Sequence, residues 1–337
     1  MKIFFAFLIL FFSFLISYLN YYINHINNKD KIFLIYCIID NFGDSINYNL
    51  LKDLTNKEII KINYCNKKFY KIFDYPNFSF IGSILDKWFI NNNSLYNYSS
   101  IPIIIYGTGF MSEIKDKKYP IRNLDIIAVR GNYSLINLKN SHYQIKKKII
   151  LGDPGLLAMY LFNLSGIQKE YKLCIIPHYI DKNIKILNNI RIKNSKILDI
   201  TDENNFMFHL AKCRRVISSS LHGLILADSL NIPNIRIILS NKIYGGNFKY
   251  NDYYSSFNLK PQKYFDLRIY NFSENDLNFI DKNYNITKDM IIKKQCDLLV
   301  NFPFSLQKKY KNIINKKCKK NYFIYIKNFL TNYFQNL

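Results

Sequence analysis

Eight apolar, β-rich runs separated by stretches of helical pattern constrain the fold of this 337-residue chain. Several of these runs are apolar without alternation, which is typical of strands that are buried on both faces of a parallel sheet. Strands that alternate with helices predict an α/β protein built mainly on parallel sheets. The predicted strands are 31–39, 101–106, 126–129, 148–151, 173–176, 197–199, 214–218 and 234–238.

The length of the chain and a break in the strand pattern indicate two domains. A chain of this size usually forms more than one hydrophobic core. The pattern breaks at residues 160–171, where a second set of strands begins. We therefore expect two facing, doubly wound, Rossmann-like domains, the first over residues 29–162 and the second over residues 163–304. Ligands of such sheets bind beyond the carboxyl ends of the strands.

The amino terminus carries an uncharged apolar run from Ile3 to Leu19. In a helix this run spans roughly 25 Å, close to the thickness of a bilayer core. The small residues of a signal-peptide cleavage site are absent. We expect residues 1–28 to be a transmembrane helix that acts as a retained signal anchor, which would make the chain a single-pass membrane protein. A cleaved signal and a buried helix are the alternatives, and the flanking charges leave the membrane side open.

The formal net charge is +23, a field that attracts phosphates, anionic sugars or an anionic membrane. Lysine that simply fills the solvated faces is an equally good explanation. No pattern of a nucleic-acid-binding domain is present, so no nucleic acid partner is expected. Lysine is densest in the tail at residues 305–337, which holds eight lysines, no acidic residue and interspersed aromatic residues. This tail is expected to be a solvated terminal helix or a segment on an anionic membrane surface.

The six cysteines form no CxxC pair and have no metal-ligand spacing. Cys37 and Cys174 lie within apolar, strand-like runs, where a free cysteine acts as a small hydrophobic side chain. The sequence therefore predicts neither a zinc site nor a disulfide framework.

Six of the predicted strands are followed directly by glycine or by polar residues. Each such cluster alone is an ordinary turn or helix cap, but six of them at the ligand-binding edge of parallel sheets favour a functional site. The clusters contain Asp44 and Asn47, Gly107 and Gly109, Arg130 with Ser134, Asp153, His178, and the run Ser219 to Gly223.

His222 lies at the junction between a predicted strand and a predicted helix that is apolar on almost all sides. Ser219 or Ser220 is expected to cap this helix, and His222 falls in its first turn. Free amides and the positive end of the helix dipole make this position an anion site. The dipole lowers the pKa of the imidazole and keeps it a neutral base, whereas a bound phosphate raises the pKa again. The arrangement favours proton transfer beside a phosphorylated substrate.

Seven short motifs, taken in order along residues 32–304, resemble those of polysaccharide pyruvyl transferases. Each motif is weak alone, and it is their common order that carries the resemblance. They are DNFGDSIN at 40–47, YGTG at 106–109, RGNYS at 130–134, LGDP at 151–154, IIPHYID at 175–181, SSSLHG with its following IP at 218–233, and FKYNDYYSSF at 248–257.

The resemblance implies a GT-B-like fold, phosphoenolpyruvate as donor and co-substrate, and no metal or other cofactor. It implies a polysaccharide or glycan acceptor whose sugar offers two neighbouring hydroxyls and is converted into a pyruvate ketal. His222 matches the family's catalytic histidine. The expected donor site consists of Arg130, Ser219, Ser220, Leu221 and Gly223. The expected acceptor or supporting residues are Asp44, Asn47, Gly107, Gly109, Asp153 and His178.

One residue departs from the pattern, because some relatives carry arginine directly before Leu-His, where this chain has Ser220. The donor phosphate would then depend on helix amides, on Arg130 or Arg214, or on a lysine. Two other functions stay open at this point. One is a glycosyltransferase that uses a nucleotide sugar on the same fold, and the other is a non-catalytic anchored relative.

Overall fold

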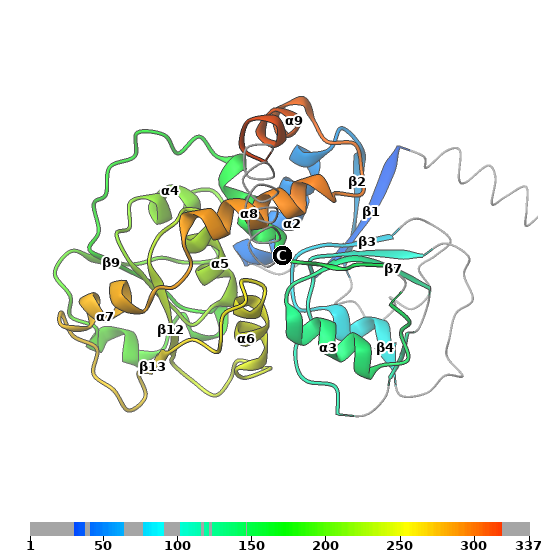
Figure 1. Ribbon diagram of the computed structural model, residues 1–337. Coiled ribbons are helices and arrows are strands. Elements are labelled where there is room, and N and C mark those ends of the chain that lie inside the picture. The colour runs from blue at the N-terminus through cyan, green and yellow to red at the C-terminus, as the bar shows by residue number, and fades with distance from the viewer. Residues whose placement is uncertain are drawn as a thin grey trace, which may run out of the picture.

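A computed structural model describes residues 30–37, 41–63, 77–90, 102–115, 118–120, 123–145 and 147–318. In this part of the chain, two parallel β-sheets form two domains that lie side by side (Figure 1). The prediction of two α/β domains with parallel sheets is therefore confirmed. The boundary predicted at residues 162 and 163 falls in the segment that joins the two sheets.

The first sheet has the strand order β2-β1-β3-β5-β7-β8. Its strands are β1 (Lys31–Tyr36), β2 (Glu58–Asn63), β3 (Asn77–Ser79), β5 (Ile103–Tyr106), β7 (Leu124–Val129) and β8 (Ile150–Leu151). From β1 the chain goes first to β2 on one side and then to β3 on the other. The sheet therefore has a topological switch point at β1, which is where doubly wound sheets bind ligands.

The second sheet has the strand order β10-β9-β11-β12-β13 and repeats this topology. Its strands are β9 (Leu173–Ile176), β10 (Ser195–Ile197), β11 (Val216–Ser218), β12 (Asn234–Ile238) and β13 (Tyr264–Asp266). The switch point here lies between β9 and β11. A small antiparallel pair, β4 (Phe89–Ile90) with β6 (Tyr119–Pro120), completes the strands of the described residues.

The helices include short 3-10 and π turns as well as α-helices. The first domain contains α2 (Phe42–Leu54), η2 (Leu85–Trp88) and α3 (Asn132–Asn140), and η4 (Pro154–Leu161) follows its last strand. The second domain contains η5 (Tyr179–Asp181), η6 (Lys185–Asn189), α4 (Phe206–Ala211), α5 (Leu221–Ser229), α6 (Phe248–Ser255) and α7 (Asp276–Asn283). The last elements are α8 (Lys288–Val300), α9 (Lys308–Ile313) and η7 (Ile314–Cys318).

The chain returns from the second domain to the first at its carboxyl-terminal end, where α8 crosses between them and α9 lies beside α2 (Figure 1). The amide of Gln307 donates to the carbonyl of Leu54 at 2.9 Å, and the buried Tyr310 donates its hydroxyl to Asp53. Residues 305–318 of the basic tail are thus attached to the first domain through Gln307 and Tyr310, while their lysines stay exposed, as expected for a solvated helix. Residues 319–337 lie outside the described part.

The two domains share one apolar core. Its largest cluster joins Leu34 and Phe42 of the first domain to Phe206 and Leu226 of the second. The rings of Phe42 and Phe206 lie 5.2 Å apart. This contact fixes the first residue of α2 against the second domain, which matters for the site described below.

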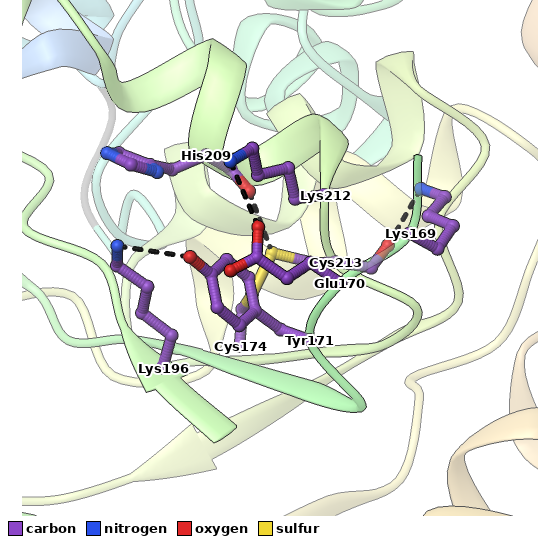
Figure 2. The surroundings of a disulfide bond; sticks show 8 residues. All are labelled: Lys169, Glu170, Tyr171, Cys174, Lys196, His209, Lys212 and Cys213. Carbon is purple, nitrogen blue, oxygen red and sulfur yellow. Dashed lines mark hydrogen bonds and ion pairs between the residues drawn. A yellow bond between two sulfur atoms is a disulfide. The ribbon is translucent and has the colours of Figure 1, made fainter. Parts of the chain in front are cut away.

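The described cysteines are disulfide-bonded, so the prediction of free Cys37 and Cys174 is wrong. Cys174 in β9 pairs with Cys213, which lies just before the neighbouring parallel strand β11 (Figure 2). Their Cα atoms are 5.8 Å apart although 39 residues separate them in sequence. Sequence spacing cannot show this adjacency, because only the strand order of the sheet creates it. A second disulfide joins Cys296 to Cys318.

The buried Cys174–Cys213 disulfide is covered by polar contacts at the edge of the second domain (Figure 2). Lys169 donates its ammonium to the carbonyl of Cys213 at 2.7 Å, and Lys212 pairs with Glu170 at 2.9 Å. These contacts hold the strand-to-strand connection in which the bond lies.

Within the described residues, no helix combines the length and apolar character needed to cross a bilayer. The predicted anchor at residues 1–28 lies outside the described residues and stays a prediction.

Candidate active site

The amino termini of α2 and α5 meet between the two domains, and each helix follows a strand at a switch point of its sheet. A Cβ atom added to Gly43 in α2 would lie 2.0 Å from both Cγ and Nδ1 of His222 in α5. Only glycine therefore allows the backbone of α2 to approach the imidazole so closely. This contact brings the first and sixth predicted motifs together.

Asn41 sets the start of α2 and the orientation of Asp44. Its side-chain oxygen accepts the amide of Gly43 at 3.1 Å, and its side-chain nitrogen donates to the Asp44 carboxylate at 2.8 Å. The amide of Phe42 donates to the carbonyl of Ile200 in the second domain at 2.7 Å. Asp44 is thereby held in the first helical turn, next to the glycine that contacts His222.

The start of α5 leaves backbone amides free. Ser220 is the N-cap residue, as predicted, but its side chain makes no capping hydrogen bond. Its amide donates to the hydroxyl of Ser218 at 3.0 Å. The amides of Leu221, His222 and Gly223 have no hydrogen-bond acceptor among the described residues. Unpaired amides at a helix start form an anion-binding position.

Gly223 lets α5 press against its sheet. A Cβ atom there would lie 2.4 Å from the Ser218 hydroxyl and 2.9 Å from Cγ2 of Ile176. Leu221 packs in an apolar cluster with Tyr250. Leu221 and Gly223 therefore serve packing in this structure, and the predicted contact of this run with a donor stays a prediction.

The environment shifts the pKa values of His222 and Asp44 in opposite directions. Burial, together with the nearby charges of Lys249, Arg130 and His178, lowers the pKa of His222 to about 3. Burial raises the pKa of Asp44 to about 7, although Lys249 opposes this shift. Each side chain keeps some exposed surface, but protein surrounds it on most sides. The site therefore pairs a neutral imidazole with a carboxyl that holds its proton up to neutral pH.

His178 lies two residues after β9, at the start of η5, and its charge affects His222. Its own pKa is lowered to about 3 by burial and by Lys249. The backbone amide of His178 donates to the Ser219 hydroxyl at 2.9 Å. That hydroxyl donates to Asp181 at 3.3 Å, and Ser240 donates to the other Asp181 oxygen at 2.5 Å. Asp181 thus ties together the ends of β9, β11 and β12.

Arg130 is fully buried and donates to protein groups through all its guanidinium nitrogens. Nε donates to Asp252 at 2.9 Å, Nη2 to the carbonyl of Phe110 at 2.5 Å, and Nη1 to the Ser83 hydroxyl. Asp252 also accepts the amide and the hydroxyl of Ser134, at 2.8 and 2.7 Å. The RGNYS and FKYNDYYSSF motifs therefore join the domains here, and the predicted contact of Arg130 with a donor stays a prediction.

The other predicted supporting residues shape the first domain around the site. Asn47 is buried and accepts the amide of Ile81 at 2.8 Å. A Cβ atom on Gly109 would lie 2.6 Å from the Arg130 guanidinium carbon, so Gly109 makes room for that side chain. These residues hold backbone loops and make no side-chain contact with His222.

The Gly-Asp-Pro motif follows β8 and packs against the end of β5. Gly107 has a φ of +87°, and a Cβ atom there would lie 2.2 Å from Cδ of Pro154. Asp153 is buried and caps η4 by accepting the amide of Gly155 at 2.8 Å. Burial raises the pKa of Asp153 to about 6. The Gly-Asp-Pro motif therefore forms a tightly packed turn that starts η4.

Three further residues of the quoted motifs were not predicted as site residues, namely Lys249, Asp252 and Asp181. Lys249 is 6% exposed, and burial lowers its pKa to about 8. The charge of this lysine affects His222, His178 and Asp44. The one available signal was its place in the last motif of the ordered set.

Residues 41–241 match the family model for polysaccharide pyruvyl transferases. The chain belongs to this family. The matched region contains both helix starts, His178 and Arg130, whereas Lys249 and Asp252 lie beyond its carboxyl-terminal end. Family membership supports a transferase of polysaccharide biosynthesis.

Two curated proteins are similar in sequence. An uncharacterised protein of Acanthamoeba polyphaga mimivirus is 30% identical over 283 residues, which cover 81% of this chain and 91% of that protein. The succinoglycan biosynthesis protein ExoV of Rhizobium meliloti (strain 1021) is 23% identical over 150 residues, which cover 44% of each chain.

Two solved structures show a lower similarity. An uncharacterised protein of Klebsiella pneumoniae aligns with a TM-score of 0.40 at 17% identity, covering 74% of this chain and 97% of that one. The wall teichoic acid polymerase TagF aligns with a TM-score of 0.38 at 9% identity, covering 86% of this chain and 93% of that one.

Proposed function

We propose that this protein transfers the pyruvyl group of phosphoenolpyruvate to two neighbouring hydroxyls of a sugar in a polysaccharide or glycan, forming a pyruvate ketal. Family membership and the similarity to ExoV support transfer in polysaccharide biosynthesis. The donor and the ketal chemistry come from the family resemblance and from the groups gathered at the site.

One observation supports the proposal above all others. The imidazole of His222 lies against Gly43 at the junction of two helix starts, beside a carboxyl of opposite pKa shift and a buried lysine. A reaction that protonates one carbon, deprotonates two hydroxyls and releases phosphate needs an acid, a base and a cationic region. These groups occur together where the two sheets switch direction.

The opposite pKa shifts of Asp44 and His222 favour a separate role in proton transfer for each side chain. Asp44 retains its proton near neutral pH and is the better proton donor to C3 of the donor. His222 is neutral and is the better acceptor for the proton of an attacking sugar hydroxyl.

Atoms and protons balance in the proposed reaction. Protonation at C3 converts the methylene into a methyl group and makes C2 electrophilic. The first sugar oxygen bonds to C2, the C2–O bond to phosphate breaks, and the second sugar oxygen bonds to C2. Of the two hydroxyl protons, one restores the proton given to C3 and the other leaves with phosphate. No oxidant or reductant is needed.

The test incubates the purified full-length chain with phosphoenolpyruvate and a panel of sugars that carry neighbouring hydroxyls. Phosphate release and the proton NMR methyl signal of a ketal are measured together. The proposal expects both signals to depend on phosphoenolpyruvate and on acceptor. Transfer from a nucleotide sugar would identify a glycosyltransferase, and binding of phosphoenolpyruvate without turnover on any acceptor would favour a non-catalytic relative.

A further inference from the structure

Lys249 is an enclosed lysine that forms no ion pair with any carboxylate in the described part of the chain. It occupies the second position of α6 and is 6% exposed. Among the described residues, no hydrogen-bond acceptor or carboxylate pairs with its ammonium group. Its recorded contact is with the ring of Tyr250, whose centroid lies 5.5 Å from Nζ.

The side chain of Lys249 is enclosed, but its ammonium nitrogen is not one of the fully buried atoms without a partner, so it keeps contact with solvent. Partial loss of hydration disfavours the charged form of an ammonium group unless a hydrogen bond or an opposite charge replaces the lost water. A bound anion would supply both to this accessible nitrogen.

The charges around Lys249 leave the site cationic. Arg130 and Arg236 lower the pKa of Lys249, and Asp44 is the single negative group that raises it. Arg130 is already paired with Asp252, whereas Arg236 has no carboxylate partner and stacks on Tyr250 at 3.8 Å. Because burial raises the pKa of Asp44 to about 7, its carboxyl is only partly ionised at neutral pH and offsets only part of this charge.

Lys249 and the unpaired amides of α5 lie on neighbouring helix starts. Tyr250, the residue after Lys249, donates its hydroxyl to the carbonyl of Ser219 at 2.6 Å and packs in one cluster with Leu221. The charge of Lys249 also lowers the pKa of His222, which lies in the first turn of α5. A ligand that satisfies both features must carry negative charge and accept several hydrogen bonds. Phosphate, sulfate and carboxylate groups meet these requirements.

The position of Lys249 is fixed from the other domain. Asp252 lies three residues further along α6 and is clamped by Arg130 and Ser134 of the first domain. This clamp holds the start of α6, and with it Lys249, beside the interface. Arg130 thus has a positioning role in the structure, through Asp252.

We propose that Lys249 binds the anionic group of the donor opposite the α5 amides, in place of the arginine that this chain lacks at Ser220. The identity of the donor as phosphoenolpyruvate rests on the proposed function, whereas the binding of a phosphate-like anion does not.

The test measures affinity by calorimetry for two probes, inorganic sulfate and phosphoenolpyruvate, with full-length protein. Lys249→Met should weaken both affinities by roughly 10–100-fold, because it removes a charged hydrogen bond. It should raise KM for phosphoenolpyruvate more than it lowers kcat. Lys249→Arg should restore most of the affinity. Lys260→Met, which removes an exposed lysine after the same helix, is the matched control and should change neither affinity.

The outcomes separate this inference from the proposed function. Unchanged affinity of Lys249→Met for both probes would overturn the anion site, even if the wild-type protein forms a ketal. Lysine-dependent binding of sulfate without any turnover would retain the anion site and reject the proposed reaction. Should Lys249→Met fail to fold, Lys249→Gln replaces it, since glutamine keeps a hydrogen-bond donor and loses the charge.

Discussion

The two domains meet at two clusters of polar residues, which differ in whether their charged groups are paired. At the first, Arg130, Asp252 and Ser134 are fully buried, and each charge is paired and hydrogen-bonded. At the second, Lys249 and His222 lie close to each other with no carboxylate paired to either, and nearby α5 amides are unpaired.

This difference separates a clamp from a binding site. A buried pair whose hydrogen bonds are satisfied fixes geometry, and removing one partner leaves an uncompensated charge. Buried groups without partners cost stability, and they acquire partners only when a ligand arrives. The clamp consists of Arg130, which follows β7, Ser134 in α3 and Asp252 in α6, and of these elements α6 also carries Lys249.

The largest effect is expected on turnover in His222→Asn. General acid–base groups contribute about 10²–10⁴-fold to rate, and asparagine keeps a similar size while losing the titration. Phosphate release from phosphoenolpyruvate should fall by that factor, with an unchanged melting temperature. Near-normal turnover in this variant would assign His222 to packing against Gly43.

The next largest effect is expected on stability in Asp252→Asn. This change leaves the Arg130 guanidinium buried without a counter-charge, which typically costs about 3–5 kcal/mol. Chemical denaturation measures the loss. Asp125→Asn, which breaks the exposed pair with Lys147, is the control and should cost at most about 1 kcal/mol. Equal losses of unfolding free energy in the two variants would show that the buried Arg130–Asp252 pair stabilises the protein no more than an exposed pair does.

Removal of the Cys174–Cys213 disulfide is expected to cost somewhat less. Opening a loop of 39 residues releases chain entropy worth about 4 kcal/mol in the loop-closure model. The double variant Cys174→Ser/Cys213→Ser should unfold at a lower denaturant concentration than the wild-type protein when both are produced under oxidising conditions. Mass spectrometry of the untreated wild-type protein should find no free thiol at either position, and a free thiol there would contradict the structure.

The smallest effect concerns the pH profile. The pKa of Asp44 is raised to about 7, so its proton is present below that pH and is lost above it. If Asp44 is the proton donor, kcat/KM should fall about tenfold per pH unit above pH 7. In Asp44→Asn this limb should disappear and the residual rate should be flat. Persistence of the limb in Asp44→Asn would place the acid elsewhere.

The sequence was sufficient for the architecture because the strands are apolar runs of unusual clarity. Each of the eight predicted strands overlaps an observed strand, although 197–199 overlaps β10 (Ser195–Ile197) at one residue only. The strands β2, β3, β4, β6 and β13 were missed because they are short or more polar. The convergence of strand-end motifs also followed from the sequence, since parallel strands share one edge. His222 at the start of α5 is the clearest case.

Other features depend on contacts that no local pattern encodes. Arg130 meets Asp252 from 122 residues away, so neither its burial nor its partner was predictable. Cys174 and Cys213 become neighbours through strand order alone. Lys249 could not be singled out by residue type, because lysine is abundant throughout the chain and only burial distinguishes this one.

The central claim is that the ammonium group of Lys249 and the first amides of α5 bind a ligand and do not stabilise the fold. The most direct test is the free energy of unfolding of Lys249→Met, measured by chemical denaturation without any added anion. Because the change removes an unpaired buried charge, the variant should be at least as stable as the wild-type protein. A loss comparable to that of Asp252→Asn would contradict the account, since it would show that Lys249 has a structural partner in the free protein.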